Sequence, residues 1–182
     1  MRLTQFSNFA VRILMYVGLK GDGPSSVPEV AKAYGISQDH LKKAAAELCH
    51  LGVLEAVRGR TGGVRLTQHT DTISIGAVVR ATEGGSPLVE CFDPETNTCP
   101  LISRCRFRLA LQEAQEAFFA VLDRHSLGDL IEDEIALRGL VGLEGKREAP
   151  SVHCRQERGE ASPDEDKKQS NDDAIPPQDQ AR

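Results

Sequence analysis

Residues 26–52, SVPEVAKAYGISQDHLKKAAAELCHLG, decide the fold of this chain. Ser26 is a favourable N-cap and Pro28 suits a first helical turn, so a short helix is expected to begin here. A glycine-containing turn follows, and Ser37 then caps a longer helix over residues 38–51 with one apolar stripe. A short helix, a tight turn and a longer helix together predict a helix-turn-helix.

The second helix of such a motif enters the major groove of DNA with its first residues at the base edges. Amide and basic side chains at these positions can pair with adenine, guanine or phosphate. For each residue taken singly, a solvated helix face is the alternative. The residues predicted to contact DNA from this helix are Ser37, Gln38, Asp39, His40, Lys42 and Lys43.

A β-hairpin is predicted directly after this helix. Residues 53–57 and 64–67 are expected to be strands, and the segment between them, RGRTGG, has glycines that permit the positive φ values of a turn. A hairpin in this place is a wing, so Arg58 and Arg60 are predicted to lie along the duplex or in its minor groove. The glycines do not form a P-loop, because no GK[ST] follows and the loop joins two strands.

An amphipathic helix is predicted over residues 3–19, ahead of the helix-turn-helix. Asn8 and Arg12 lie one turn apart on a polar face, where they are available to a partner. The apolar residues recur at helical spacing and are expected to supply core: Phe6, Phe9, Ala10, Ile13, Leu14 and Val17.

Three of the five cysteines lie close together in CFDPETNTCPLISRC, residues 91–105. The thiolates of Cys91, Cys99 and Cys105 can converge on one soft metal centre, and iron–sulfur clusters are held mostly by cysteine. Unrelated thiols or half of a zinc site are the alternatives, although the paired spacing of a zinc knuckle is missing. A disulfide framework fits poorly, because three is an odd number and the N-terminus has no secretory signal pattern.

A strong helix is predicted over residues 106–122, after the cysteines. Its apolar side chains cover more than one face, so it needs a partner beyond its own core, and a second copy of the chain is expected. A helix buried within its own chain is the alternative. Residues 145–182 contain no aromatic and almost no large aliphatic residue, and they are predicted to form a disordered tail.

These elements predict a mainly α fold with a small β-hairpin. A winged helix-turn-helix DNA-binding domain is expected over residues 1–84, and the cysteine loop with a long C-terminal dimerisation helix over residues 85–135. Residues 1–66 carry nine Lys/Arg and five Asp/Glu, whereas residues 67–144 carry six and thirteen. The basic N-terminal third indicates a polyanionic partner such as double-stranded DNA.

Two further expectations concern location and chemistry. No run of eighteen apolar residues is present, so no membrane partner is expected, and a cytoplasmic location follows for a chain without a secretory signal. No ordered Ser/His/Asp set or carboxylate pair is evident, which argues against an enzyme.

Four stretches together resemble the bacterial winged-helix iron–sulfur transcriptional regulators. They are LTQFSNFAVRILMY at residues 3–16, VRGRTGGVRL at 57–66, ISIGAVVRATEG at 73–84 and VECFDPETNTCPLISRC at 89–105. The resemblance covers about residues 1–135. It implies a homodimeric repressor with one cluster in each subunit, of the [4Fe–4S] rather than the [2Fe–2S] type, that controls binding to an operator.

The resemblance also bears on the signal. IscR-like members of the family have a shorter first cysteine gap and a ligating His where this chain has Arg108, so they are disfavoured. In NsrR-like members an acidic residue of the partner subunit supplies a fourth ligand, and this chain has Asn8 there. Asn8 is thus the candidate for a weak fourth ligand or a partner-subunit contact, and it also occurs in iron-sensing RirA-like members. The VECFDPETN run is closer to NsrR, which favours nitric-oxide sensing; an iron-responsive regulator and a cluster-free thiol redox switch are the alternatives.

Overall fold

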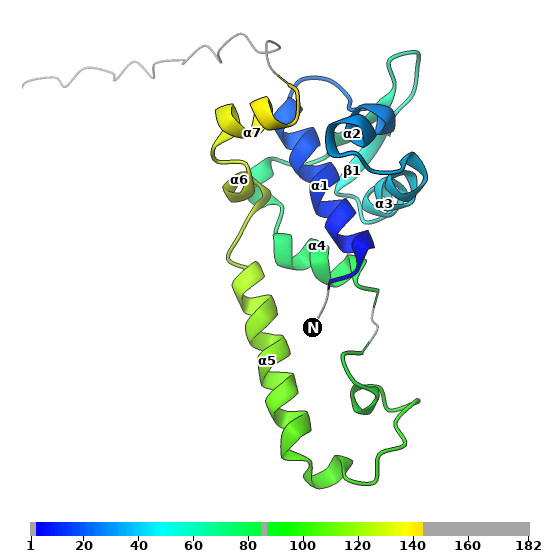
Figure 1. Cartoon of the computed structure of the whole chain (residues 1–182), viewed down its shortest axis with the longest axis vertical. Coiled ribbons are helices and arrows are strands. Elements are labelled where there is room, and N and C mark those ends of the chain that lie inside the picture. Colours follow the sequence, from blue (N-terminus) through cyan, green and yellow to red (C-terminus); the bar gives the residue numbers. More distant parts are fainter. Residues whose placement is uncertain (1–2, 85–86, 144–182) are drawn as a thin grey trace, which may run out of the picture. The chain divides into compact units, whose positions relative to one another are not determined.

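The computed structural model of the chain describes residues 3–84 and 87–143 (Figure 1). The predicted fold class, mainly α with a small hairpin, is confirmed, while the predicted tail at residues 145–182 lies outside the described residues. The main elements are α1 (Gln5–Lys20), α2 (Val27–Tyr34), α3 (Gln38–His50), β1 (Leu54–Val57), β2 (Gly63–Leu66), α4 (Ile75–Thr82), α5 (Arg106–Leu122), α6 (Leu127–Leu130) and α7 (Glu134–Leu140). Three 3-10 turns, η1 (Thr70–Thr72), η2 (Glu90–Phe92) and η3 (Ile102–Arg104), lie between them.

Most helix bounds agree with the sequence patterns, because the caps that define them are local. The Thr4 side chain accepts a hydrogen bond from the Ser7 amide at the start of α1, and Ser74 caps α4 in the same way. Helix α7 was not predicted. It has only seven residues, one of them a glycine, and the Asp133 side chain caps it through the Ala136 amide. Within the described residues, no helix is both long and apolar enough to cross a membrane.

Helix α1 lies at the centre of the core, in contact with α3, α4, α6, α7 and β2 (Figure 1). Burying each large aliphatic side chain stabilises the fold by roughly 1.5–3 kcal/mol, so this shared core dominates the stability. Phe6 and Phe9 are only half-buried and pack against the edge of the core. Fully buried side chains come from several elements and include Ala10, Ile13, Leu14, Leu19, Leu41, Leu48, Leu54 and Leu127.

The helix-turn-helix is fixed by a capping box at the start of α2. The Ser26 amide donates to the Glu29 carboxylate (2.7 Å), and the Glu29 amide donates to the Ser26 hydroxyl (3.4 Å). Gly35 then closes the turn in the left-handed conformation (φ 63°) that glycine adopts without cost.

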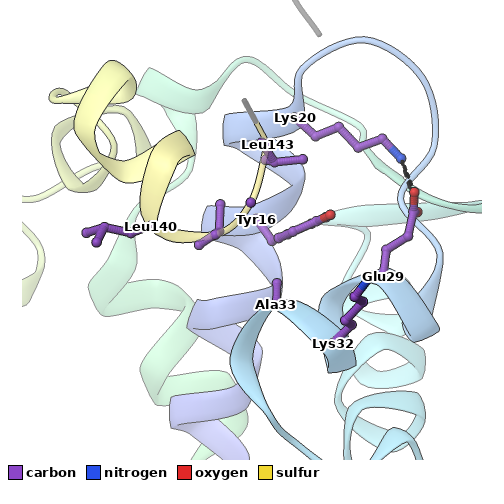
Figure 2. A pocket seen from close by; sticks show the side chains of 9 residues that line it. Tyr16, Lys20, Glu29, Lys32, Ala33, Leu140 and Leu143 are labelled. Carbon is purple, nitrogen blue, oxygen red and sulfur yellow. Dashed lines mark hydrogen bonds and ion pairs between the residues drawn. The ribbon is translucent and has the colours of Figure 1, made fainter. Parts of the chain in front are cut away.

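Lys20 ties the end of α1 to this box. Its ammonium lies 3.1 Å from the Glu29 carboxylate (Figure 2). It also donates to the Pro24 carbonyl at 2.8 Å. Burial disfavours the charged Glu29 carboxylate, but hydrogen bonds from Ser26 and Lys20 outweigh that effect and keep the pKa of Glu29 below its usual value. An open cavity of about 480 Å³ lies beside the pair, with Tyr16 and Leu143 in its wall (Figure 2).

The hairpin pairs β1 with β2 in antiparallel register, with Leu54 opposite Leu66. Only Gly59 in its loop has a positive φ, at 125°. Gly62 and Gly63 are needed because other backbone atoms lie too close to leave room for a side chain. An added Cβ would lie 2.5 Å from the Val57 carbonyl oxygen at Gly62 and 2.3 Å from the Ser25 carbonyl oxygen at Gly63.

Two adjacent serines give opposite predictions for stability. Ser26→Ala removes a cap and is expected to lower the free energy of unfolding by about 1 kcal/mol. Ser25→Ala should leave the free energy of unfolding unchanged or raise it. The buried Ser25 hydroxyl has no hydrogen-bond partner in the described part of the chain, so its removal breaks no bond. Urea unfolding of both variants checks this; equal losses would contradict it.

Candidate nucleic-acid interface and cysteine loop

The first turns of α3 present a continuous exposed face. Ser37 occupies the N-cap position, yet its side chain makes no cap hydrogen bond, so the hydroxyl is available to another partner. The six side chains predicted to contact DNA are all exposed there: Ser37, Gln38, Asp39, His40, Lys42 and Lys43.

Two of these side chains are already oriented by neighbours. The Lys42 ammonium lies 3.2 Å from the Asp39 carboxylate, which reduces its attraction for a phosphate. The His40 ring stacks on the Phe9 ring of α1, with centroids 5.9 Å apart and planes at 18°. This stacking restricts the ring, so His40 presents an edge in a fixed direction.

The wing carries three exposed arginines, one of which the sequence reasoning missed. Arg58 and Arg60 lie in the loop, exposed as predicted. Arg65 lies on β2, and its guanidinium is 2.6 Å from the carboxylate of Glu55, the residue directly opposite it on β1. The pairing register of the hairpin would have revealed this ion pair, and it leaves Arg58 and Arg60 as the stronger candidates for binding phosphate.

The three clustered cysteines lie between α4 and α5. Cys91 falls in η2, Cys99 lies in the following loop, and Cys105 is the N-cap of α5; all three are half-buried and unbridged. The Cys105 sulfur accepts a hydrogen bond from the Arg108 amide at 3.3 Å. A backbone amide at the start of α5 therefore points at the Cys105 sulfur.

Arg108 links the two ends of the cysteine loop, and the sequence reasoning did not foresee this role. Its Nε donates to the Cys91 carbonyl at 3.2 Å, and its guanidinium lies over the Phe92 ring at 5.8 Å from the centroid. Cys91 is thereby anchored to the first turn of α5, beside Cys105.

The donor chemistry fits an iron–sulfur cluster, because three unbridged thiols share one loop. The three sulfurs are not gathered into a ready site: within residues 3–84 and 87–143 no group of three His, Cys, Asp or Glu side chains is arranged to hold a metal ion. Cys49 is a different kind of thiol. It packs against the core, and burial raises its pKa, which disfavours the metal-binding form. Asn8 is exposed on α1.

Helix α5 buries none of its seventeen residues within its own chain. Phe107 and Leu109 are 69% and 60% exposed, and Leu101, just before the helix, is 68% exposed. The alternative expectation, a helix buried within its own chain, is therefore wrong. These large apolar side chains are therefore uncovered within the described part of the chain.

The head of α1 to α4 with its hairpin defines a winged helix-turn-helix protein, and the solved structure of IscR from T. potens has the same fold (TM-score 0.59, 22% identity, 73% of this chain and 88% of that one). The family model described as "Rrf2: Iron-dependent Transcriptional regulator" matches residues 3–133. The chain belongs to the Rrf2 family of transcriptional regulators.

Two relatives are similar over nearly their whole length. The HTH-type transcriptional regulator NsrR of Geobacillus kaustophilus is 46% identical over 142 residues, which cover 78% of this chain and 97% of that protein. The HTH-type transcriptional repressor NsrR of Streptomyces coelicolor is 45% identical over 133 residues, covering 72% and 88%. The resemblance to NsrR-like regulators is thus confirmed.

Replacing Arg108 tests the anchoring of the loop. Arg108→Ala removes a charged hydrogen bond of about 1.5 kcal/mol, so amide exchange at residues 90–92 should become about tenfold faster. Arg106→Ala, an exposed arginine two residues earlier, is the matched control. Equal exchange in the two variants, followed by mass spectrometry, would show that Arg108 does not hold the loop.

Proposed function

We propose that this protein is a dimeric, DNA-binding transcriptional repressor whose affinity for its operator depends on an iron–sulfur cluster held by Cys91, Cys99 and Cys105. Nitric oxide is the proposed signal. The observation that carries the proposal is the set of three unbridged thiols on one loop of a chain 46% identical to an NsrR regulator.

Helix α3 and the wing are proposed to form the DNA-binding surface. Gln38 has an amide that can pair bidentately with adenine, and Lys43 can reach guanine or phosphate. Arg58 and Arg60 are proposed to contact the backbone beside the minor groove. The remaining proposed contacts are Ser37, Asp39, His40 and Lys42, of which Lys42 already has a carboxylate neighbour.

The partner of α5 is proposed to be α5 of a second copy. Its apolar side chains are uncovered in one chain, and a two-fold dimer would bury them while presenting two α3 helices to successive half-sites. Asn8 is proposed as a contact of the partner subunit or a weak fourth ligand; a neutral amide binds iron poorly, which would leave one iron accessible.

The three thiolates would hold the cluster, of the [4Fe–4S] type in this proposal. When bound, it supplies iron that reacts with nitric oxide. In the protein, Cys105 caps α5 and Arg108 anchors Cys91 to the same turn. If these cysteines no longer bound the cluster, the first turn of α5 would be free to move. Breaking one direct interaction with a base weakens DNA binding by about 1–3 kcal/mol, so a small reorientation would release the operator.

Two alternatives have specific support. The family description names iron-dependent regulation, which favours an iron-responsive regulator. The unbridged thiols in the described residues equally allow a cluster-free thiol switch.

The experiment uses the full chain, reconstituted anaerobically, and duplexes that it selects from a random library. Nitric oxide should weaken binding at least tenfold. Binding lost to an iron chelator but unaffected by nitric oxide would favour iron sensing. Protein that takes up no iron, yet loses binding to a thiol oxidant, would favour the thiol switch.

The wing arginines give a prediction of their own. Arg60→Ala should lower affinity for all duplexes and reduce the slope of log K against log salt by about 1, because the protein then neutralises one phosphate fewer. Gln38→Ala should instead relax discrimination at one base pair by about 1–3 kcal/mol. Arg124→Ala, an exposed arginine after α5, is the control. An unchanged salt slope in Arg60→Ala would remove the wing from the interface.

A further inference from the structure

Helix α4 contacts both α1, which packs against α3, and α5, which follows the cysteine loop. On one side it packs against α1 of the head, and on the other it is the main packing partner of α5 (Figure 1). No residue of α5 is fully buried, although Phe119 and Leu122 near its end pack partly against the core. Helix α4 is the element that α5 contacts most, so the direction of α5 depends largely on α4.

Arg80 makes the principal contact on the α5 side. Its two terminal nitrogens donate to the two carboxylate oxygens of Asp123 at 2.6 and 2.5 Å, a bidentate pair. The same guanidinium lies over the Phe119 ring, 4.6 Å from its centroid. A planar fork held by a carboxylate and a ring has one allowed orientation, which a lysine could not reproduce.

Gly76, one turn before Arg80, leaves the space for this carboxylate. A Cβ at Gly76 would lie 2.0 Å from the Asp123 Oδ1 and 2.9 Å from its backbone nitrogen. The glycine in the first turn of α4 is therefore explained by the position of Asp123. It also offers a way to disturb the ion pair while both charges remain.

The opposite end of α4 is fastened to the start of α1. The Thr82 hydroxyl donates to the buried Ser7 hydroxyl at 2.9 Å, and the Glu83 carboxylate accepts from the Thr4 amide and hydroxyl at 2.9 and 3.0 Å. A displacement of α4 would thus be passed to α1, which lies against α3.

We propose that Arg80 is a positioning residue: by pairing with Asp123 beside Phe119, it sets the direction in which α5 joins the head and so carries the state of the cysteine loop to α3. Helix α5 links the cysteine loop to α4 directly, since its N-cap is Cys105 and its C-cap is Asp123, with a rigid helix of about 25 Å between them. This inference rests on the proposed function.

Hydrogen bonds from Arg80 keep the pKa of Asp123 below its usual value, with burial opposing them more weakly. The carboxylate is therefore charged at neutral pH. The pair would weaken only in acid, as pH falls through that lowered pKa, so neutral conditions suit the test.

The test compares wild type, Arg80→Ala, Gly76→Ala and the control Arg124→Ala. For each, the affinity for the selected duplex is measured with the cluster loaded and after its removal, together with thermal melting and visible absorption. Wild type and Arg124→Ala should show a ratio of the two affinities of roughly tenfold or more. Arg80→Ala should keep its absorption while this ratio falls toward one. Gly76→Ala should do the same, although alanine is the better helix former.

A merely structural role would lower both affinities by the same factor and leave the ratio unchanged, which would overturn the inference. If Arg80→Ala does not fold, the ratio of the two affinities is measured in Gly76→Ala and Arg80→Lys instead. Amide exchange in α4 is then the second measurement. Cluster removal should alter that exchange in wild type and not in these variants. A ratio near one in the wild type would instead overturn the proposed function itself.

Discussion

A seventeen-residue helix that buries none of its own side chains sets the constraint on which this structure depends. Phe107 and Leu109 of this helix are exposed among the described residues, and the proposed dimer would cover them. Its last turn is held by the Arg80–Asp123 pair and its first turn by the Cys105 cap. A partner that covers α5 and a ligand that binds its first turn would therefore act on the same rigid helix, and α4 is the helix of the head that contacts it.

The head itself is built for stability, in contrast to the loop. Helix α1 shares its core with α3, α4 and β1, and the capping box of Ser26 and Glu29 fixes the turn between the two helices of the motif. The cysteine loop has 3-10 turns and a few side-chain hydrogen bonds, with no fully buried residue among those described between 87 and 105. A stable head beside a weakly held cysteine loop would suit the proposed switch, since elements that move are drawn from the less stable parts of a fold.

Much of the fold was predictable because its signals are local. Ser26, Ser37 and Ser74 marked three helix starts, and the hydrophobic stripe of α1 marked its buried face. The Glu55–Arg65 and Arg80–Asp123 pairs were not foreseen, because they join residues whose neighbourhood only the register or the tertiary packing defines. The same holds for Arg108, which reaches back across the loop to Cys91. The cysteine spacing indicated a metal site, but spacing alone does not define how the loop folds.

The central claim is that three particular sulfurs hold iron. It is tested most directly by the iron and acid-labile sulfide bound per chain, with the visible absorption, in anaerobically reconstituted wild type and in the single variants Cys91→Ser, Cys99→Ser and Cys105→Ser. Cys49→Ser, at the half-buried core thiol, serves as control. The account predicts that each loop variant loses most of its iron and colour while Cys49→Ser keeps both. Full iron and colour in the three single loop variants would contradict it.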